Sequence, residues 1–252
     1  MTGVQTCALP ISQNALALPG LRVLQYGASP IHPDTLAQMM AVMGDAKFVN
    51  MFGQTEGSPI SCLTSADHVL AANGRSDLLE SVGRAVAGVE MMIADPGPDG
   101  VGEVHARAAH FFKPDADGWL RTGDLGRIDS EGYLFLSGRK GDKIIRGGEN
   151  IYPIEVEQVV ASHPAIADVC VFAIPDRKFG EIVGAAMVSV AGVERPSVAE
   201  LSAFARQSLG GFKVPTVWEW SDSLPRNAAG KVLRREIVAR YAGVFNDGNQ
   251  ST

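Results

Sequence analysis

The chain has 252 residues, enough for one large domain or two ordinary ones. Hydrophobic residues make up 46% and charged residues 20%, which allows a sizeable core and excludes disorder throughout. A net charge of −6 and a pI near 5.4 argue against nucleic acid as a partner, and the longest apolar runs, such as 169–174, are too short to cross a bilayer.

The first residues differ in character from the rest of the chain. Residues 1–11 resemble the translation of a short-read sequencing adapter in one reading frame. We therefore expect residues 1–12 to be a non-native leader and the gene to continue upstream. Without Cys7, only Cys62 and Cys170 remain, which predicts neither a disulfide framework nor a cysteine metal site. We find no secretory signal and expect a soluble, cytoplasmic protein.

Hydrophobic periodicity and turn residues predict strands and one helix in the first half of the chain. Glycine and proline end the first strand at Gly27, and a turn cluster at 96–100 separates two alternating segments within 83–107. The other predicted elements are a strand at 21–26, a helix at 33–43 and strands at 48–52 and 133–136. We expect residues 13–140 to form one domain.

The second half changes character after an expected exposed connection at 138–150, which is rich in glycine and charge. Pro153 is suited to the first turn of a helix, and Pro164 stops that helix. The elements predicted beyond it are strands at 167–174 and 182–190, a helix at 197–209, a strand at 214–220 and a helix at 231–241. This order indicates a compact α+β module over residues 141–252.

Three segments carry side chains suited to a nucleotide. Phe52 offers a ring that can stack on a base, Thr55 a hydroxyl for phosphate and Glu56 a carboxylate for Mg²⁺, although a simple strand-ending turn explains the same residues. Asp124 follows a glycine turn and can accept ribose hydroxyls, and Lys231 on a glycine-containing loop can reach an anion. The segments are 50–56 (NMFGQTE), 118–125 (GWLRTGDL) and 225–231 (PRNAAGK).

These segments, in this order, resemble motifs of the AMP-forming acyl-CoA synthetase family of adenylating enzymes. The resemblance runs from about residue 20 to 241 and includes the adenine-side loop at 27–30, Gly-Arg-Lys at 138–140 and RGGENIYP at 146–153. It implies an α/β and α+β fold. Residues 13–140 would be the carboxyl-terminal part of the large domain, with mixed sheets and a distorted barrel, and the small α+β domain would follow.

The resemblance also implies a role for each matching residue. Lys231 would be catalytic, bridging the carboxylate and the α-phosphate, and Glu56 would bind the metal. Residues implied to bind the nucleotide are Gly27, Ala28, Ser29, Phe52, Gly53, Gln54, Thr55, Asp124 and Arg139. Residues implied to bind CoA are Arg146, Gly147, Gly148 and Glu149, and Gly141 takes the place of the hinge residue, usually Asp or Lys, with Asp142 as the rival pivot.

The implied reaction joins a carboxylic acid, fatty or aryl, to CoA with ATP, Mg²⁺ and an acyl-AMP intermediate. Two alternatives are an adenylation domain that loads a carrier protein and a binding fragment without catalysis. No Ser/Thr/Gly-rich phosphate loop ending in Lys occurs in the chain, so we expect that loop upstream and the chain alone to be inactive. We expect no nucleic-acid partner, and the sequence is compatible with a homodimer.

Two further groups of residues are open to more than one interpretation. The basic residues of the last helix, Lys231, Arg234, Arg235 and Arg240, fit a solvated face and CoA phosphates equally well. The histidines show no metal-binding spacing, and we expect each on the surface or in a loop. These are His32, His68, His105, His110 and His163.

Overall fold

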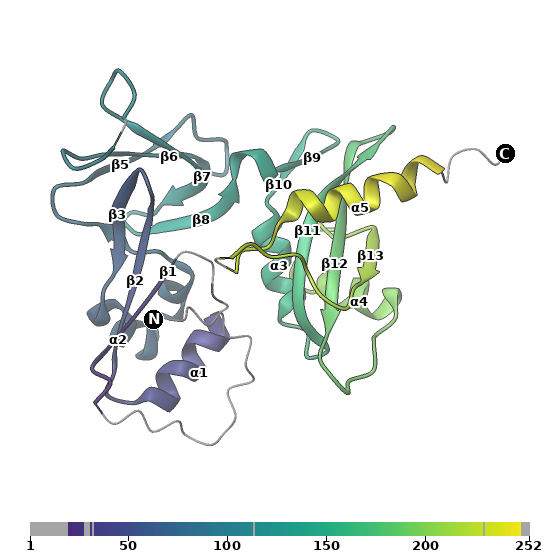
Figure 1. Ribbon diagram of the computed structural model, residues 1–252, viewed down its shortest axis with the longest axis horizontal. Coiled ribbons are helices and arrows are strands. Elements are labelled where there is room, and N and C mark those ends of the chain that lie inside the picture. The colour runs from purple at the N-terminus through teal and green to yellow at the C-terminus, as the bar shows by residue number, and fades with distance from the viewer. Residues whose placement is uncertain (1–19, 28–30, 32, 113, 229, 248–252) are drawn as a thin grey trace. The chain divides into compact units, whose positions relative to one another are not determined.

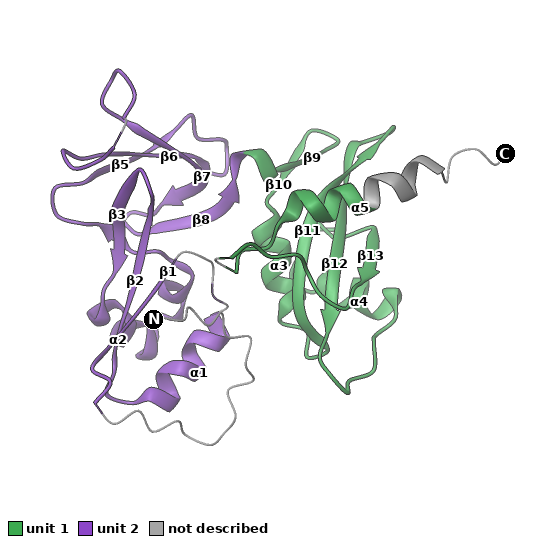
Figure 2. Ribbon diagram, in the orientation of Figure 1, with its two compact units in different colours: residues 1–8, 141–252 green, residues 9–140 purple. Residues whose placement is uncertain are grey.

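The computed structural model of the protein describes residues 20–27, 31, 33–112, 114–228 and 230–247. The chain divides into two compact units, and the boundary falls between Lys140 and Gly141 (Figure 2). We call the described residues up to Lys140 unit 2 and those from Gly141 unit 1. The predicted leader, residues 1–12, lies outside the described residues.

The first sheet of unit 2 combines parallel and antiparallel strands. Its strand order is β1-β2-β3-β4, in which β1 pairs with β2 in parallel and the other pairs are antiparallel. The strands are β1 (Val23–Gly27), β2 (Lys47–Gln54), β3 (Gly57–Leu63) and β4 (Arg84–Ala85). Helix α1 (Pro33–Met43) forms the crossover from β1 to β2, as parallel pairing requires (Figure 1).

The second sheet of unit 2 is an antiparallel meander. Its strands are β5 (Glu90–Ala94), β6 (Gly102–Arg107), β7 (Leu120–Ile128) and β8 (Leu134–Arg139), and they pair in chain order. Between the two sheets in sequence lie helix α2 (Ser65–Ala72) and the short 3₁₀ helix η1 (Ser76–Glu80). Buried Ile60 of β3 packs with Ala106 of β6 and Leu120 of β7, so one apolar cluster joins the two sheets.

Unit 1 is built on one sheet in the order β10-β9-β12-β11, with β13 also paired to β12. Its strands are β9 (Ile144–Arg146), β10 (Glu149–Ile151), β11 (Ile166–Asp176), β12 (Gly180–Ser189) and β13 (Val217–Trp220). Its helices are α3 (Pro153–Ala161), α4 (Val198–Ala205) and α5 (Arg234–Asp247), and η2 (Lys140–Asp142) crosses the unit boundary.

Alternating side chains of β11 supply two cores on opposite faces of this sheet. Val171 packs in one cluster with Val156 of α3 and Leu201 of α4. Phe172, the next residue, packs in the other cluster with Ile237 of α5. Because successive strand side chains point to opposite faces, one apolar run can be buried on both sides. Helices therefore cover both faces of the sheet in unit 1 (Figure 1).

The structure confirms most of the predicted elements and adds others. The helices expected at 33–43 and from Pro153 are α1 and α3, and the strands expected at 167–174 and 182–190 are β11 and β12. Strands β3 and β7 and helix α2 were not predicted. The mixed sheets confirm the expected fold class, and the described strands of unit 2 form open sheets, not a closed barrel.

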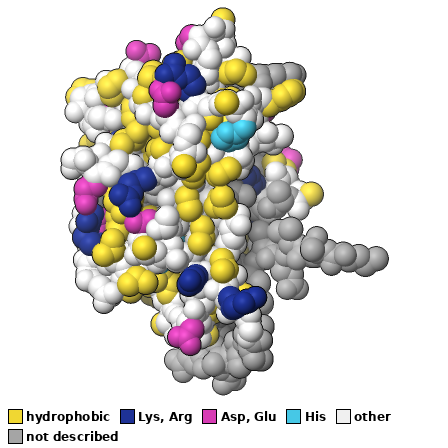
Figure 3. Space-filling view, turned by 90° about the vertical axis from the view of Figure 1, so that its left-hand side faces the viewer, with side chains coloured by type: hydrophobic (Ala, Val, Ile, Leu, Met, Phe, Trp, Pro, Cys, Tyr) yellow, Lys and Arg dark blue, Asp and Glu magenta, His cyan; other side chains and the backbone are white. Residues whose placement is uncertain are grey.

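The surface mixes apolar and charged side chains. On the face drawn in Figure 3, apolar side chains gather along the middle, and basic and acidic ones are scattered around them. Exposed large apolar residues include Val23 on β1, Val69 and Leu70 on α2, and Phe112 after β6. Among the described residues, no helix is both long and apolar enough to traverse a membrane.

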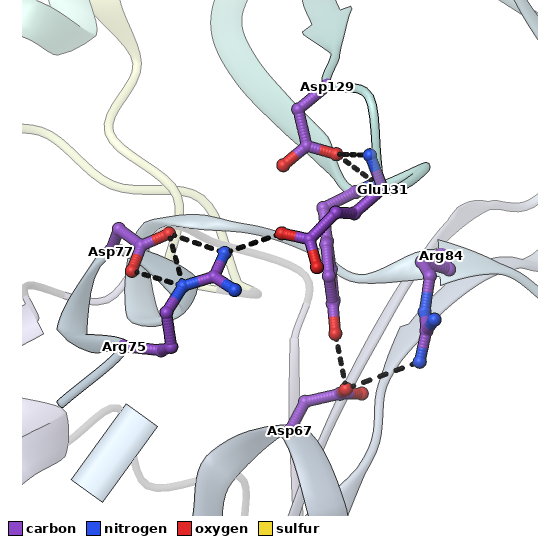
Figure 4. A network of polar contacts seen from close by, with 7 residues as sticks. Asp67, Arg75, Asp77, Arg84, Asp129 and Glu131 are labelled. Atoms are coloured by element: carbon purple, nitrogen blue, oxygen red, sulfur yellow. Dashed lines mark hydrogen bonds and ion pairs between the residues drawn. The ribbon is translucent and has the colours of Figure 1, made fainter. Parts of the chain in front are cut away.

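A buried carboxylate, Asp67, connects α2 to the second sheet of unit 2. Asp67 is only 2% exposed and closes the capping box of α2 by accepting hydrogen bonds from the amide and hydroxyl of Thr64. It also accepts a hydrogen bond from the Tyr133 hydroxyl at 2.7 Å, and Arg84 lies 3.5 Å away (Figure 4). Burial raises the pKa of Asp67, but these donors outweigh burial and hold the pKa below its ordinary value.

We predict that Asp67→Asn lowers the free energy of unfolding by about 2 kcal/mol at neutral pH, because the charged acceptor is lost. Since the folded pKa is depressed, the carboxylate contributes stability fully above the unfolded pKa of about 3.9. The difference between variant and wild type should therefore be constant above about pH 5 and shrink as the pH falls further. Urea unfolding at a series of pH values measures it.

Asp77→Asn is the matched control. Asp77 forms an exposed ion pair with Arg75, and exposed pairs of this kind contribute little to stability (Figure 4). The control should leave the stability curve nearly unchanged. Equal pH dependence in the two variants would contradict the role that we assign to Asp67.

Candidate functional site

The carboxyl ends of β1 and β2 lie side by side because the two strands are parallel. Gly27, the last residue of β1, is in register with Met51 of the NMFGQTE segment. A Cβ on Gly27 would stand 2.4 Å from the Met51 carbonyl oxygen, so this close approach requires glycine. Ligands of open α/β sheets bind at such carboxyl ends. The predicted site residues Ala28 and Ser29 lie outside the described residues.

The NMFGQTE segment ends in a tight hairpin between β2 and β3. Gln54 pairs with Gly57, which leaves Thr55 and Glu56 as the two turn residues, and both are exposed. The Phe112 amide donates a hydrogen bond of 2.7 Å to the Glu56 carbonyl and so anchors the turn. The hydroxyl and the carboxylate that the sequence singled out therefore stand at an anchored, solvent-accessible tip.

The hairpin tip packs directly on the second sheet. A Cβ on Gly57 would lie 2.6 Å from Leu120 and 2.9 Å from Phe111, and one on Gly53 would lie 2.7 Å from the Ser58 hydroxyl. Leu120 is the first residue of β7, the strand that carries Asp124. Half-buried Phe52 packs against the same apolar cluster. Unit 2 thus brings the first two predicted motifs together.

Asp124 and Arg139 face each other across β7 and β8. They are direct partners in the register, and the Arg139 Nε lies 2.7 Å from the Asp124 carboxylate. Asp124 is buried at 8% exposure, while half of the Arg139 side chain is exposed. The Thr122 hydroxyl accepts a hydrogen bond from the Asp124 amide, and the Thr122 carbonyl accepts one from Arg139. The pair is a pre-oriented acceptor and donor of the kind that two vicinal hydroxyls can bind.

A second ion pair, which the sequence did not indicate, lies beside this one. Lys140 donates to Glu103 at 2.8 Å, and Glu103 also accepts from the amide of Gly123, next to Asp124. Burial raises the pKa of Glu103, but Lys140, His105 and the Gly123 amide outweigh it and leave the pKa below its ordinary value. The carboxylate therefore stays charged and holds the Gly123 turn in place.

Two histidines correct the expectation that all five lie on the surface or in loops. His68 is buried on α2, where its Nδ1 donates to the Thr64 carbonyl and its Nε2 accepts from the Tyr26 hydroxyl at 2.8 Å. Burial lowers the pKa of His68 and raises that of Tyr26 to about 12, so both stay neutral. His105 is buried on β6. The residue type alone did not indicate that His68 would lie on the buried face of a helix or His105 on the buried face of a strand.

No group of three or more His, Cys, Asp or Glu residues that could hold a metal ion occurs in the described part of the chain. The predicted metal ligand Glu56 is a single exposed carboxylate. Mg²⁺ in nucleotide enzymes is typically held by one or two carboxylates together with substrate phosphates. Glu56 fits that mode of binding and does not fit an all-protein metal site.

The predicted CoA-binding residues form a hairpin in unit 1. Residues 147–150 are exposed, as expected for the connection at 138–150, but they belong to paired strands and a tight turn. Arg146 of β9 pairs with Glu149 of β10, and Gly147 and Gly148 form the turn with positive φ of 60° and 92°. Two successive positive φ angles are typical of a type I′ turn, which favours glycine. Arg146 donates to the Phe212 carbonyl at 2.5 Å and lies over the Phe179 ring, so its side chain is held.

Lys231 lies on a loop that is closed by hydrogen bonds from the neighbouring residues Arg226 and Asn227. The side chain of Asn227 accepts from the Lys231 amide at 2.9 Å, and the Asn227 amide donates to the Lys231 carbonyl at 2.9 Å. Arg226 donates to the Gly230 carbonyl at 2.6 Å, and Gly230 has a positive φ of 79°. Lys231 itself is exposed. The exposed Lys231 thus has both its backbone amide and its carbonyl hydrogen-bonded to Asn227, three residues before α5 begins.

Comparison with known proteins agrees with this organisation. Residues 4–114 match the AMP-binding enzyme family, and residues 155–231 match the AMP-binding enzyme C-terminal domain. The chain is 38% identical over 240 residues to the fatty acid–[acyl-carrier-protein] ligase ScoC of Streptomyces coeruleorubidus, covering 88% of this chain and 45% of ScoC. It is 37% identical to the medium/long-chain-fatty-acid–CoA ligase FadD8 of Mycobacterium tuberculosis, covering 89% of this chain and 42% of FadD8.

Solved structures similar to this chain also belong to enzymes of this kind. The amide bond synthetase McbA from Marinactinospora thermotolerans matches with a TM-score of 0.79 and 33% identity, over 87% of this chain and 46% of McbA. The o-succinylbenzoate CoA synthetase MenE from Bacillus subtilis, with an acyl-adenylate bound, matches with a TM-score of 0.73 and 31% identity, over 86% and 46%. The chain spans about half the length of the relatives that it matches.

Proposed function

We propose, since this chain belongs to the adenylate-forming ligase family, that it is the carboxyl-terminal portion of an acid–CoA ligase of the cytoplasm. A carboxylic acid and ATP would give acyl-AMP and pyrophosphate, and CoA would then give acyl-CoA and AMP. The fatty-acid and succinylbenzoate ligases among its relatives support a fatty or aryl acid as substrate and a role in fatty acid metabolism. Unit 2 would be the end of the large domain and unit 1 the small domain.

The observation that carries this proposal is the arrangement of unit 2. An exposed Thr55–Glu56 tip, a buried Asp124 carboxylate and the Arg139 guanidinium belong to two sheets joined by one apolar cluster. We assign the ribose hydroxyls to Asp124 and Arg139, the α-phosphate to Thr55 and the adenine surroundings to Gly27, Ala28, Ser29, Phe52, Gly53 and Gln54. Mg²⁺, held by Glu56 and phosphate oxygens, would add positive charge at the phosphates.

We assign the chemical step to Lys231. Attack of a carboxylate on the α-phosphorus brings two anions together, so a cation must neutralise the developing charge. An exposed lysine suits that task, because its side chain is accessible and of a flexible kind while its backbone amide is hydrogen-bonded to Asn227. For the thioester step we assign the pantetheine arm of CoA to Arg146, Gly147, Gly148 and Glu149, where the glycine turn permits a close backbone approach.

A second acyl acceptor has specific support. ScoC is a fatty acid–[acyl-carrier-protein] ligase, which favours the alternative that the acyl group is transferred to a carrier protein. The two proposals share the adenylation step and differ in the thiol. Supplying the complete enzyme with acid and ATP, and then with CoA or a phosphopantetheinyl carrier protein, distinguishes a soluble thioester from a protein-bound one. The closed Lys231 loop argues against a binding fragment without catalysis.

We predict that the 252-residue chain by itself shows no ATP–pyrophosphate exchange with any carboxylic acid. No Ser/Thr/Gly-rich phosphate loop ending in Lys occurs among its residues, so the β- and γ-phosphates lack their expected contacts. The complete gene product, assayed in parallel, should exchange radioactive pyrophosphate into ATP. Exchange by the 252-residue chain at a comparable rate would contradict the expectation that an essential phosphate loop is missing from it.

We predict that Lys231→Ala in the complete enzyme slows acyl-AMP formation about a hundredfold or more, because the charge at the reacting phosphorus is lost. Thioester formation from supplied acyl-AMP should be nearly unchanged, since that step does not need this ammonium. Lys47→Ala, which removes an exposed lysine at the start of β2, is the control and should alter neither rate. Equal losses in both half-reactions would refute the assignment.

We propose Gly141 as the residue about which the small domain turns between the half-reactions. A Cβ there would meet nothing within 4 Å, so Gly141→Ala should be neutral and serves as the control. Gly141→Pro fixes φ near −65°, and we predict that it preserves adenylation but loses most thioester formation. Both half-reactions are measured on each variant. If only Asp142→Pro separates them, the pivot is Asp142.

A further inference from the structure

The link between the two units is a single turn of 3₁₀ helix. It consists of Lys140, Gly141 and Asp142, and the unit boundary falls after Lys140. A link this short can transmit or absorb motion depending on how each end is attached. The attachments of Lys140 and Asp142 to their own units therefore decide how much freedom the link has.

Lys140 is attached to unit 2. Its ammonium group lies 2.8 Å from the Glu103 carboxylate, whose side chain is only 14% exposed. Glu103 also accepts the Gly123 amide at 3.3 Å and lies 3.7 Å from His105, so the acceptor is fixed by the second sheet. The last residue of unit 2 is thus bound to a carboxylate that cannot move independently of the sheet.

Asp142 is attached to unit 1 through Arg234, the first residue of α5. The Asp142 carboxylate accepts a hydrogen bond from Nη1 of Arg234. Arg234 also donates from Nε to the Val171 carbonyl at 2.8 Å and from Nη2 to Glu157 at 2.7 Å. Glu157 in turn accepts the Val171 amide at 2.8 Å. The guanidinium therefore joins β11, α3 and the link at one point.

The charges around Arg234 strengthen the hydrogen bonds that its guanidinium group makes. Its side chain is 24% exposed, and two carboxylates, Asp142 and Glu157, face it. Burial lowers the pKa of Arg234, but Glu157, Cys170 and Asp142 outweigh burial, so the guanidinium remains charged. Charge-assisted hydrogen bonds in partly buried positions are the stronger ones in proteins. Three bonds from one planar group also fix its orientation.

We propose that Arg234 is a positioning residue that binds the unit 1 end of the link to the start of α5, three residues after Lys231. The link and the Lys231 loop would then move as one body, with the remaining freedom confined to Gly141, which is exposed and unobstructed. This inference rests on the proposed function for its kinetic consequence. The attachment itself is a property of the chain and can be tested without any activity.

The first test measures amide hydrogen exchange by mass spectrometry on the 252-residue chain. Asp142→Asn retains the size of the side chain but removes the charge, and exchange in residues 141–146 should accelerate about tenfold after correction for intrinsic rates. Exchange in β11 should be unchanged. Asp222→Asn, at an exposed carboxylate 3.8 Å from Arg195 in the same unit, is the control and should alter neither segment.

Two results would overturn the attachment. One is unchanged exchange in residues 141–146 of Asp142→Asn. The other is equal acceleration in that segment and in β11, which would mean that Asp142 supports the whole unit rather than the link. Asp142→Glu, whose carboxylate can still reach the guanidinium, should restore slow exchange and gives a second, independent comparison.

The second test uses the complete enzyme. Asp142→Asn should lower kcat for acyl-AMP formation about tenfold and leave the KM for ATP nearly unchanged, because the residues that we assign to the adenine and ribose of ATP lie in unit 2 and Lys231 is assigned to the chemical step. Asp142→Glu should recover most of kcat. An unchanged kcat in Asp142→Asn would refute the positioning role. A wild-type enzyme without acyl-AMP formation would refute the proposed function instead, while the exchange result would still decide whether the attachment exists.

Discussion

The close approach of the β2–β3 hairpin tip to β7 is the constraint on which the rest of unit 2 depends. A Cβ on Gly57 would lie 2.6 Å from the Leu120 side chain and 2.9 Å from the Phe111 ring, so the hairpin approaches β7 this closely because the position has no side chain. The contact sets the exposed Thr55–Glu56 turn on the same support as the strand that carries Asp124. A larger residue would require the Leu120 and Phe111 side chains, or the hairpin itself, to shift at the contact that joins the two parts of the candidate nucleotide site.

The groups that we propose to be reactive, and the groups that support them, are divided in the same way in both units. Thr55, Glu56 and Lys231 are exposed, and their backbones are fixed by hydrogen bonds from Phe112 and Asn227. The charged groups that are buried, such as Asp67 and Asp124, are each paired with a donor. This division follows from desolvation, because an unpaired buried charge is costly whereas an exposed one remains available to a ligand.

The relatives are named for different acceptors of the acyl group, whereas the residues that we propose for adenylation and for the acceptor lie on separate elements. ScoC is named for a carrier protein, FadD8 for CoA and McbA for an amide bond. The residues proposed for adenylation sit on paired strands and closed loops of both units. The residues proposed for the acceptor sit on one hairpin, in which two glycines with positive φ form the turn and Arg146 is held by Phe212 and Phe179.

The sequence by itself determined the family, the order of its motifs and most strands and helices, because periodicity and glycine-containing motifs are properties of neighbouring residues. Helices α1 and α3 and strands β11 and β12 were predicted in this way. Only the tertiary structure decided that His68 is buried and that Arg234 binds Asp142, 92 residues away. Such pairings depend on strand register and on which face of an element is covered, and neither is encoded in a local pattern.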